Sequence, residues 1–204
     1  APMKDSGVQW LGEVPEHWAI KKLRYVCKIQ TGSRDTEEAI EDGEYPFFVR
    51  SQTVERINSY SYDCEAVLTA GDGAGVGKVF HYHTGSFDFH QRVYMLNEFN
   101  DIHGKLIYHF LKTNFFKVAL QGGAKSTVDS LRRPMFTGFP VCIPPIQEQG
   151  PLLEFVETEE KRIDKLIATS VQAVSLLQER RSALISAAVT GQIDVRGIAE
   201  EVSA

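Results

Sequence analysis

The chain has 204 residues, of which 43% are hydrophobic and 24% are charged, and its formal net charge is -5. This length can hold one compact domain plus an appendage or two small domains, and the composition excludes a disordered or fibrous protein. The sequence contains no apolar run near the roughly 18 residues that a membrane span needs, and its start lacks the pattern of a signal peptide, so we expect a cytoplasmic protein.

Short β-rich runs separated by turn residues fill much of the first two thirds of the sequence, which is typical of strands. Between the fourth and fifth run, residues 104–120 carry apolar side chains at helical spacing, so we expect one amphipathic helix that packs on the sheet. This pattern predicts a compact mixed α/β domain. The five runs predicted to be strands are residues 45–50, 65–70, 76–82, 87–96 and 139–144.

Residues 105–133 form a basic segment, with six lysines and arginines against one acid. A glycine pair follows the predicted helix, and residues 126–129 then fit a capping box for a short helix that carries Leu131 and Arg132. Acidic residues gather elsewhere, with six in residues 35–44. Phosphate neutralisation supplies most of the affinity for DNA, so the distribution of charge matters more than the negative sum, although ordinary solvated faces would segregate charge in the same way.

A long helix is predicted after the last strand, because the sequence from Pro151 to Val189 has no further proline or glycine and its apolar residues recur at a 3-4 spacing. Pro151 suits the first turn of this helix and Gly191 suits its exit. The chain therefore divides into a globular domain (1–150), a long helix (151–190) and a tail (191–204).

The apolar stripe of this helix needs a partner. A helix folded back on its own domain is the alternative, but a length of about 58 Å and the charge pair Arg180-Arg181 favour pairing with a second chain. Arg180 interrupts the stripe where an apolar residue is due. The residues expected at the dimerisation surface are Ile163, Leu166, Ser170, Leu177 and Leu184.

The glycine-rich stretch of residues 71–78 invites comparison with a phosphate-binding loop, since closely spaced glycines expose backbone N–H groups to anions. Val79 stands where a P-loop needs Ser or Thr after the lysine, and no frame of the stretch completes a GxGxxG motif. We expect a tight turn between strands that brings Lys78 near a DNA phosphate.

Three histidines and one aspartate could ligate a metal, but exposed strand histidines are the better interpretation because no second shell or open site is evident. The signatures of amino-methyltransferases, serine hydrolases and PD-(D/E)xK nucleases are missing from the sequence. The metal candidates are His81, His83, His90 and Asp88.

The three cysteines, Cys27, Cys64 and Cys142, lie far apart without a CxxC pair. This spacing suggests neither a disulfide framework nor a zinc site, so we expect reduced, buried thiols.

A polar, partly basic set lies on the predicted loops and strand ends. Arginine and glutamine have the forked geometry that reads guanine and adenine edges in the major groove, although each residue taken singly is more often an ordinary surface residue. The candidate DNA-binding residues are Ser33, Arg34, Arg50, Ser51, Gln52, Lys78, Gln91, Arg92, Lys125, Ser126, Arg132 and Arg133.

The order of three segments resembles the specificity subunits of type I restriction-modification systems. The first is the opening KDSGVQWLGEVPEHWAIKKLRYVCKIQTG, in which Trp10, Pro15 and Trp18 lead into the first strand. The second is GAKSTVDSLRRPMFTGFPVCIPPIQEQ with its closing Pro-Pro-x-x-Glu-Gln, and the third is ERRSALISAAVTGQIDV at the end of the helix. Pro151 departs from the family pattern in a way expected to delay the helix start by a turn.

The resemblance implies an α+β fold, in which a β-rich recognition domain grips one half of a split double-stranded DNA target and a long C-terminal α-helix forms an antiparallel coiled coil. A full subunit holds two such domains and two such helices, so this chain is expected to be a half-subunit, either natural or excised. Family members position methyltransferase subunits and the restriction, or translocase, subunit without being enzymes. No cofactor is expected on this chain, and S-adenosylmethionine is expected on the methyltransferase partner.

Two other functions remain open from the sequence. One is a stand-alone DNA-binding regulator without a methyltransferase partner, and the other is a coiled-coil scaffold that only oligomerises. Co-purification with a methyltransferase separates the first function from both, and DNA affinity at moderate salt separates the regulator from the scaffold.

Overall fold

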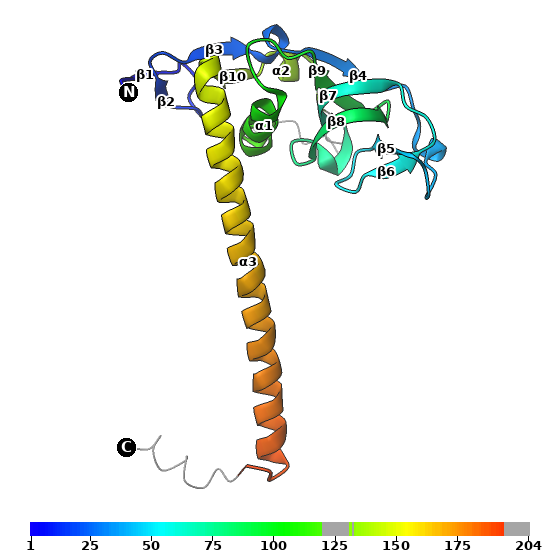
Figure 1. Cartoon of the computed structure of the whole chain (residues 1–204), viewed down its shortest axis with the longest axis vertical. Helices are drawn as coiled ribbons and strands as arrows, with labels where there is room; N and C mark the ends of the chain where they lie inside the picture. Colours follow the sequence, from blue (N-terminus) through cyan, green and yellow to red (C-terminus); the bar gives the residue numbers. More distant parts are fainter. Residues whose placement is uncertain (120–130, 132, 194–204) are drawn as a thin grey trace. The chain divides into compact units, whose positions relative to one another are not determined.

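The computed structural model describes residues 1–119, 131 and 133–193. Contacts divide the chain into two compact units, residues 1–153 and residues 154–204. Each unit is described by itself below, with the elements labelled as in Figure 1. None of the helices in the described part of the chain is long and apolar enough to cross a membrane.

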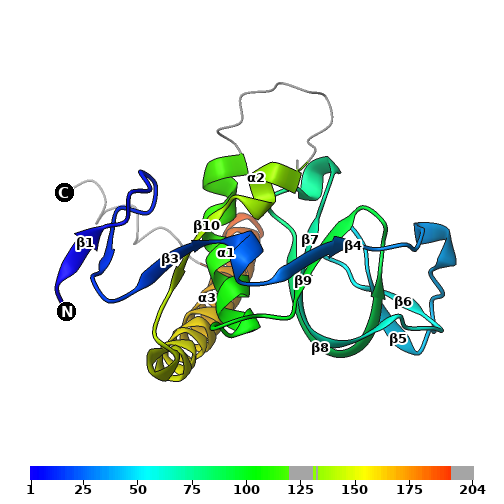
Figure 2. The ribbon, with the colours of Figure 1, turned by 90° about the horizontal axis from the view of Figure 1, so that it is seen from above.

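A six-stranded sheet forms the centre of the first unit, with strand order β4-β9-β7-β8-β5-β6. Neighbouring strands are antiparallel except for β5 and β8, which are parallel. Arg34, which follows β4, forms an isolated bridge with His90, which follows β8. The sheet therefore curves so that the edge strand β4 approaches the end of β8 (Figure 2). The strands are β4 (Lys28–Thr31), β5 (Tyr45–Phe48), β6 (Glu55–Ile57), β7 (Tyr62–Ala70), β8 (Phe80–Phe89) and β9 (Val93–Asn97).

The central strand β7 is buried on both faces. Successive side chains of a strand point to opposite faces, and accordingly Val67 belongs to one apolar cluster and Leu68 to another. The cluster around Leu68 gathers Phe48, Phe87 and Phe89 inside the curved sheet. An apolar cluster therefore lies on each face of β7.

Helix α1 (Gly104–Ala119) covers the other face of the sheet, as the sequence predicts for residues 104–120. It packs against β7 and β8 through Ile107, Leu111 and Phe115, which recur every four residues and are fully buried. The α+β class is thereby confirmed, with a mixed β-rich domain and a long C-terminal helix.

Small elements complete the first unit. Trp10 stacks on Phe139 with ring centroids 5.2 Å apart, which joins the N-terminal segment to the core. Two two-stranded sheets pair β1 (Met3–Asp5) with β2 (Glu13–Pro15) and β3 (Ala19–Lys22) with β10 (Pro140–Ile143). The short helices are η1 (Leu23–Tyr25), η2 (Thr36–Glu38), η3 (Gly73–Gly75) and α2 (Arg133–Thr137).

Two predicted strands need correction. The run 87–96 is not one strand, because β8 ends at Phe89 and β9 begins at Val93, with a turn closed by the Val93 N–H donating to the His90 carbonyl. The run 76–82 is a strand only from Phe80, since the residues before it belong to the glycine-rich turn. The turn between β8 and β9, residues 90–92, contains no glycine or proline, and the apolar Val76 and Val79 extend a strand-like pattern into the glycine-rich turn before Phe80.

The long helix α3 spans Ile146–Val189, 44 residues or about 66 Å, and so begins five residues before Pro151. The expectation that Pro151 opens the helix is wrong. Pro151 forfeits one helical hydrogen bond, but the turn that precedes it is held by the first unit. The Gln149 amide donates to the carbonyls of Asp101 (2.7 Å) and Pro144 (2.9 Å) and accepts from the His103 N–H (2.9 Å).

Glu148 supplies a second anchor for the same turn. Its carboxylate accepts from Trp18 Nε1 at 2.9 Å and contacts His17 Nε2 at 2.7 Å. These bonds, that of Trp18 first, lower the pKa of the Glu148 carboxyl. Glu148 and Gln149, the closing Glu-Gln of the Pro-Pro-x-x-Glu-Gln motif, thus attach the start of α3 to the first unit.

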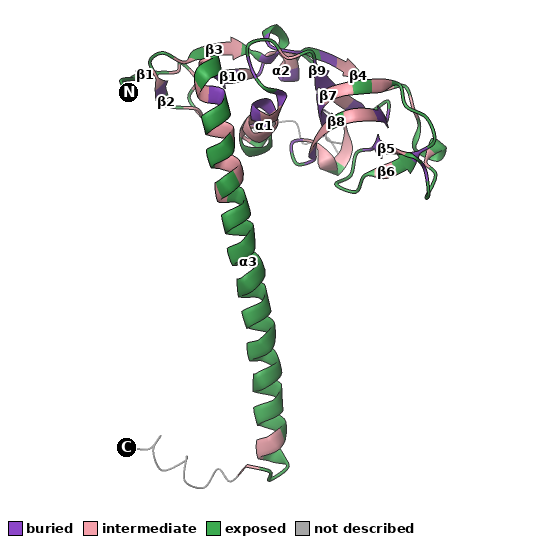
Figure 3. Cartoon of the chain, viewed as in Figure 1, coloured by how far each residue is buried: buried purple, intermediate pink, exposed green. Residues whose placement is uncertain are grey.

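The second unit consists, where described, of the remainder of α3 and the turn that follows it. All side chains of residues 161–186 are exposed in the single chain (Figure 3). The exposed residues include the members of the predicted dimerisation surface: Ile163, Leu166, Ser170, Leu177 and Leu184.

Candidate nucleic-acid interface

Four loops meet at one end of the curved sheet, which we call the barrel end. They follow β4 (residues 32–35), β5 (49–53) and β7 (71–79), or join β8 to β9 (90–92). Backbone hydrogen bonds tie them together, from Gln91 N–H to the Arg34 carbonyl, from His90 N–H to Phe48 and from Gly71 N–H to Arg92. The candidates that lie on these loops are Ser33, Arg34, Arg50, Ser51, Gln52, Lys78, Gln91 and Arg92.

The other four candidates come from the basic segment. Lys125, Ser126 and Arg132 lie outside the described residues, as does the predicted capping box at 126–129. Arg133 opens α2, where its Nη2 donates to the Ile29 carbonyl at 3.4 Å. The Leu131 N–H donates to the Gly71 carbonyl at 2.8 Å, so this part of the basic segment reaches the barrel end.

The three lysines of α1 contact the domain's own aromatic rings. Their ammonium groups lie 5.2 to 5.7 Å from ring centroids, a distance at which the ring quadrupole attracts a cation. The pairs are Lys105 with Tyr82, Lys112 with Tyr108 and Lys117 with Trp10.

At the centre of the barrel end, Asp72 lies between two arginines. Its Oδ1 accepts from Arg50 Nη1 at 2.9 Å and its Oδ2 accepts from Arg92 Nη1 at 3.2 Å. The Asp72 side chain is 19% exposed, whereas those of Arg50 and Arg92 are 42% and 58% exposed. The arginines are therefore held from the protein side and open to solvent on the other.

Arg34 has a structural position instead. Its Nε donates to Asp88 Oδ2 at 2.9 Å, Nη1 to Glu38 Oε2 at 2.8 Å and Nη2 to Ser59 Oγ at 3.1 Å. Asp88 is fully buried and also accepts from Ser61 Oγ at 2.7 Å. A buried carboxylate needs such partners, so Arg34 stabilises the fold. Its guanidinium group, which a base contact would require, is already used in these bonds.

Both glutamines and Ser51 contact neighbouring residues. Gln52 donates to the Lys78 carbonyl at 3.1 Å, and Gln91 donates to Asp35 Oδ2 at 2.7 Å. The Ser51 carbonyl lies 2.9 Å from His81 Nε2. Each contact ties one loop of the barrel end to another loop or to a strand.

The expectation of exposed strand histidines is wrong for His90. It is 3% exposed, and its Nδ1 accepts from the Arg92 N–H at 2.9 Å. Burial first, and then the charge of Arg50, lower the pKa of His90, so its neutral form is favoured. His81 and His83 are half-buried and pack on Phe48, and the described residues contain no group of three or more His, Cys, Asp and Glu side chains that could hold a metal ion.

The three cysteines are free thiols. Cys27 and Cys142 are buried as expected, whereas Cys64 is half-buried. Burial raises the pKa of Cys27 to about 12 and raises the pKa of the other two thiols as well. A raised pKa keeps these groups protonated and poorly nucleophilic.

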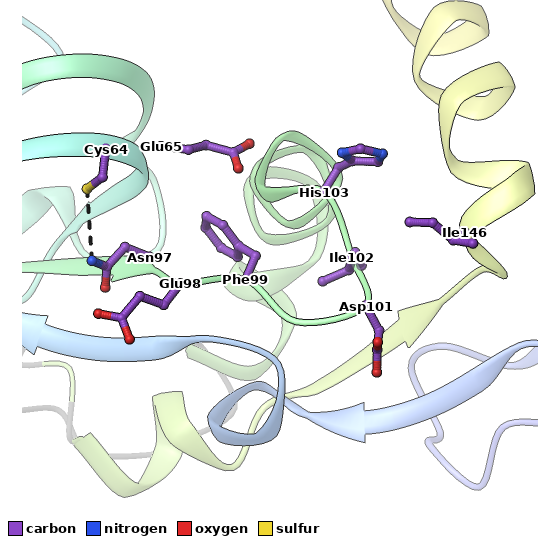
Figure 4. A pocket seen from close by; sticks show the side chains of 9 residues that line it. All are labelled: Cys64, Glu65, Asn97, Glu98, Phe99, Asp101, Ile102, His103 and Ile146. Carbon is purple, nitrogen blue, oxygen red and sulfur yellow. Dashed lines mark hydrogen bonds between the residues drawn. The ribbon is translucent and has the colours of Figure 1, made fainter.

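A cavity of about 450 Å³ lies in the first unit beside the start of α1 (Figure 4). Its lining includes the carboxylates of Glu65, Glu98 and Asp101 together with His103 and Phe99. Carboxylates repel phosphate, so this cavity does not extend the nucleic-acid surface.

Sequence reasoning missed two residues that organise the barrel end. Asp72 was seen only as part of a glycine-rich stretch, although an acid between glycines is itself a signal of a fixed turn. Asp88 was assigned to a metal candidate, and its partner Arg34 to DNA. Neither pairing has a local signal, because the partners lie 20 to 54 residues apart in sequence.

Three solved structures resemble this fold. The type I restriction-modification S subunit from M. genitalium gives a TM-score of 0.60 at 14% identity, over 74% of this chain and 41% of that one. A chain from a structure of a type I R-M system, described for its complex assembly and conformational transition, gives 0.69 at 17%, over 91% and 48%. The HsdS subunit from Thermoanaerobacter tengcongensis gives 0.63 at 15%, over 94% and 48%.

Sequence comparison identifies the family. The specificity subunit of the Escherichia coli type I restriction enzyme EcoDI is 31% identical over 182 residues, which are 89% of this chain and 40% of that protein. The chain thus spans less than half the length of this relative. Residues 15–174 match the family model of the type I restriction modification DNA specificity domain, and the chain belongs to that family.

Proposed function

We propose that the chain is a DNA recognition subunit of a type I restriction-modification complex. In this proposal the first unit, taken as the recognition domain, contacts one half of a bipartite double-stranded target through the barrel end. The observation that supports the proposal is that Arg50 and Arg92 are held side by side at the barrel end by Asp72, in a chain of this family. Forked guanidinium groups are the commonest readers of guanine in the major groove.

The long helix is the second part of the proposal. Two copies of α3 pair antiparallel through Ile163, Leu166, Ser170, Leu177 and Leu184, and the coiled coil sets the distance between two recognition domains. Support comes from the exposure of Leu166 (58%) and Leu177 (64%), because an extended apolar stripe is costly to leave in water. Methyltransferase subunits, which bind S-adenosylmethionine, and the restriction subunit are the partners that the assembly positions, and the chain itself is non-catalytic.

Two measurements test this function. The full chain is titrated with random-sequence duplex DNA at moderate salt, and it is co-expressed with the methyltransferase subunit of its own host. We expect DNA binding that weakens steeply with salt, and co-purification of the methyltransferase. DNA binding without co-purification would indicate a stand-alone regulator, and the absence of both would indicate a scaffold.

The matched variants are Arg50→Ala with Arg92→Ala at the barrel end and Lys22→Ala with Lys4→Ala in the small sheets. Each pair removes two positive charges. We expect the arginine pair to weaken binding to DNA and the lysine pair to leave it unchanged. Equal losses would contradict the location of the interface.

A further inference from the structure

The glycine-rich stretch holds an acid between the two arginines of the barrel end. Each carboxylate oxygen of Asp72 accepts from one arginine, Oδ1 from Arg50 at 2.9 Å and Oδ2 from Arg92 at 3.2 Å. The two guanidinium groups are thus bridged by one carboxylate. Their remaining nitrogens make no hydrogen bond among the described residues, and the side chains of Arg50 and Arg92 are 42% and 58% exposed.

Backbone packing fixes this bridge. A Cβ at Gly71 would lie 2.8 Å from the Arg92 carbonyl oxygen, and a Cβ at Gly75 would lie 2.5 Å from the Arg50 carbonyl oxygen. The glycines therefore allow the turn to touch the backbone of both arginines, and the Gly71 N–H donates to the Arg92 carbonyl at 2.8 Å. This close approach places Asp72 between the arginine side chains and gives the stretch a role other than phosphate binding.

A phosphate clamp does not need this arrangement. A carboxylate between two arginines leaves a local charge of only +1, which weakens attraction to the DNA backbone. It also holds one end of each guanidinium, so that the remaining donors are presented in a fixed direction. A fixed fork favours the paired acceptors O6 and N7 of guanine over any single phosphate oxygen.

We infer that Asp72 is a positioning residue for base choice, which orients Arg50 and Arg92 as readers of two guanines in the half-site. This inference rests on the proposed DNA-binding function and deepens it. Asp72 touches no base. It restricts the directions of the two arginines and lowers the affinity of the barrel end for DNA of unrelated sequence.

The test compares selectivity with bulk affinity. The full chain is used to select duplexes from a randomised library, and affinities for the selected pool and for unselected random duplex are then measured for each variant. The variants are Asp72→Asn, which removes the charge with little change of shape, and Arg50→Lys and Arg92→Lys, which keep the charge and lose the fork. Glu37→Gln is the control, because Glu37 is an exposed acid of the neighbouring η2 helix with no arginine contact among the described residues.

We expect Asp72→Asn to bind random duplex more tightly than the unmodified chain, while its preference for the selected pool falls about tenfold. The base pairs at which it loses choice should be those at which the two lysine variants lose choice. Glu37→Gln should keep the full preference. Thermal unfolding of each variant verifies that the domain is folded.

Several results would overturn the inference, and each can be distinguished from the others. If Asp72→Asn keeps its choice at every base pair, or loses affinity equally for selected and random duplex while folded, Asp72 only supports the loop. If Asp72→Asn is unfolded, intact choice in both lysine variants contradicts the inference. If the unmodified chain binds no duplex or enriches no sequence, the proposed function fails, and the inference fails with it.

Discussion

The barrel end and the long helix differ in what their exposed side chains contact. At the barrel end, Gln52 and Gln91 are each held by an atom from another loop and Arg34 is held by Asp88 of β8, so the surface is fixed by the domain that carries it. Along α3, residues 161–186 are all exposed, and the hydroxyls of Thr169, Ser170 and Ser182 bond only to carbonyls of their own helix.

The two regions therefore depend on different contacts for their stability. The first unit has a core and buried polar partners of its own, so its surface geometry is set before any partner arrives. A helix with an exposed apolar stripe gains most of its stability from packing, and in the proposed assembly a second helix supplies that packing. The domain is therefore expected to survive changes in α3 that abolish assembly.

The largest expected effect follows from breaking the helix surface. The double variant Leu177→Glu with Leu184→Glu should weaken self-association at least about 1,000-fold. Each leucine that the dimer would bury contributes roughly 1.5 to 3 kcal/mol to the free energy of association, and the dimer of the variant lacks four of them. Sedimentation velocity measures the association, and circular dichroism should show that the domain remains folded.

Leu176 offers a matched control. It is 59% exposed and adjacent to Leu177 in sequence, but it lies about 100° away around the helix and off the stripe. Leu176→Glu should dimerise like the unmodified chain, whereas Leu177→Glu should not. Equal behaviour of the two single variants, or an unmodified chain that is already monomeric, would contradict the assigned surface.

A smaller effect is expected within the barrel end itself. Arg34→Ala leaves the buried Asp88 carboxylate without its charged partner and should lower the free energy of unfolding by about 3 kcal/mol. Arg50→Ala breaks only a half-exposed pair with Asp72 and should cost less than about 1 kcal/mol. Urea unfolding distinguishes them, and similar losses for both arginines would show that Arg34 has no special structural role.

The sequence predicts the parts of this contrast that depend on local periodicity. Helix α1 and the body of α3 follow from the spacing of apolar residues, and residues 65–70 of β7 follow from a short run of β-forming residues. The turn at His90 and the start of α3 depend on partners distant in sequence. Gln149, for instance, bonds to residues 46 and 48 positions away, and no window around Pro151 contains that information.

The candidate site shows the same division. Residue type and loop position were sufficient to select candidates of which eight of the twelve lie at the barrel end. They were not sufficient to separate Arg34, which holds Asp88, from Arg50 and Arg92, which Asp72 leaves open to solvent. That distinction is set by tertiary pairing and burial.

The smallest expected effect concerns the basic segment. We predict that Lys125, Arg132 and Arg133 lie along the phosphates, so alanine at each should weaken binding to every sequence and reduce the salt slope by about one. Lys22→Ala in β3 is the control and should leave the slope unchanged. Relaxed choice at a single base pair would show instead that the substituted residue reads a base.

Binding selection from randomised duplex, with the methyltransferase subunit present, tests most directly the proposal that two chains, each with one recognition unit and one spacer helix, form a twofold assembly on DNA. In the proposed assembly a twofold axis would relate the two copies, so the selected target should be an inverted repeat with an unread gap and half-site centres about 10 base pairs apart. Deleting one heptad from α3 should shorten that gap by roughly three base pairs. Recovery of a single uninterrupted, asymmetric site would contradict the twofold assembly.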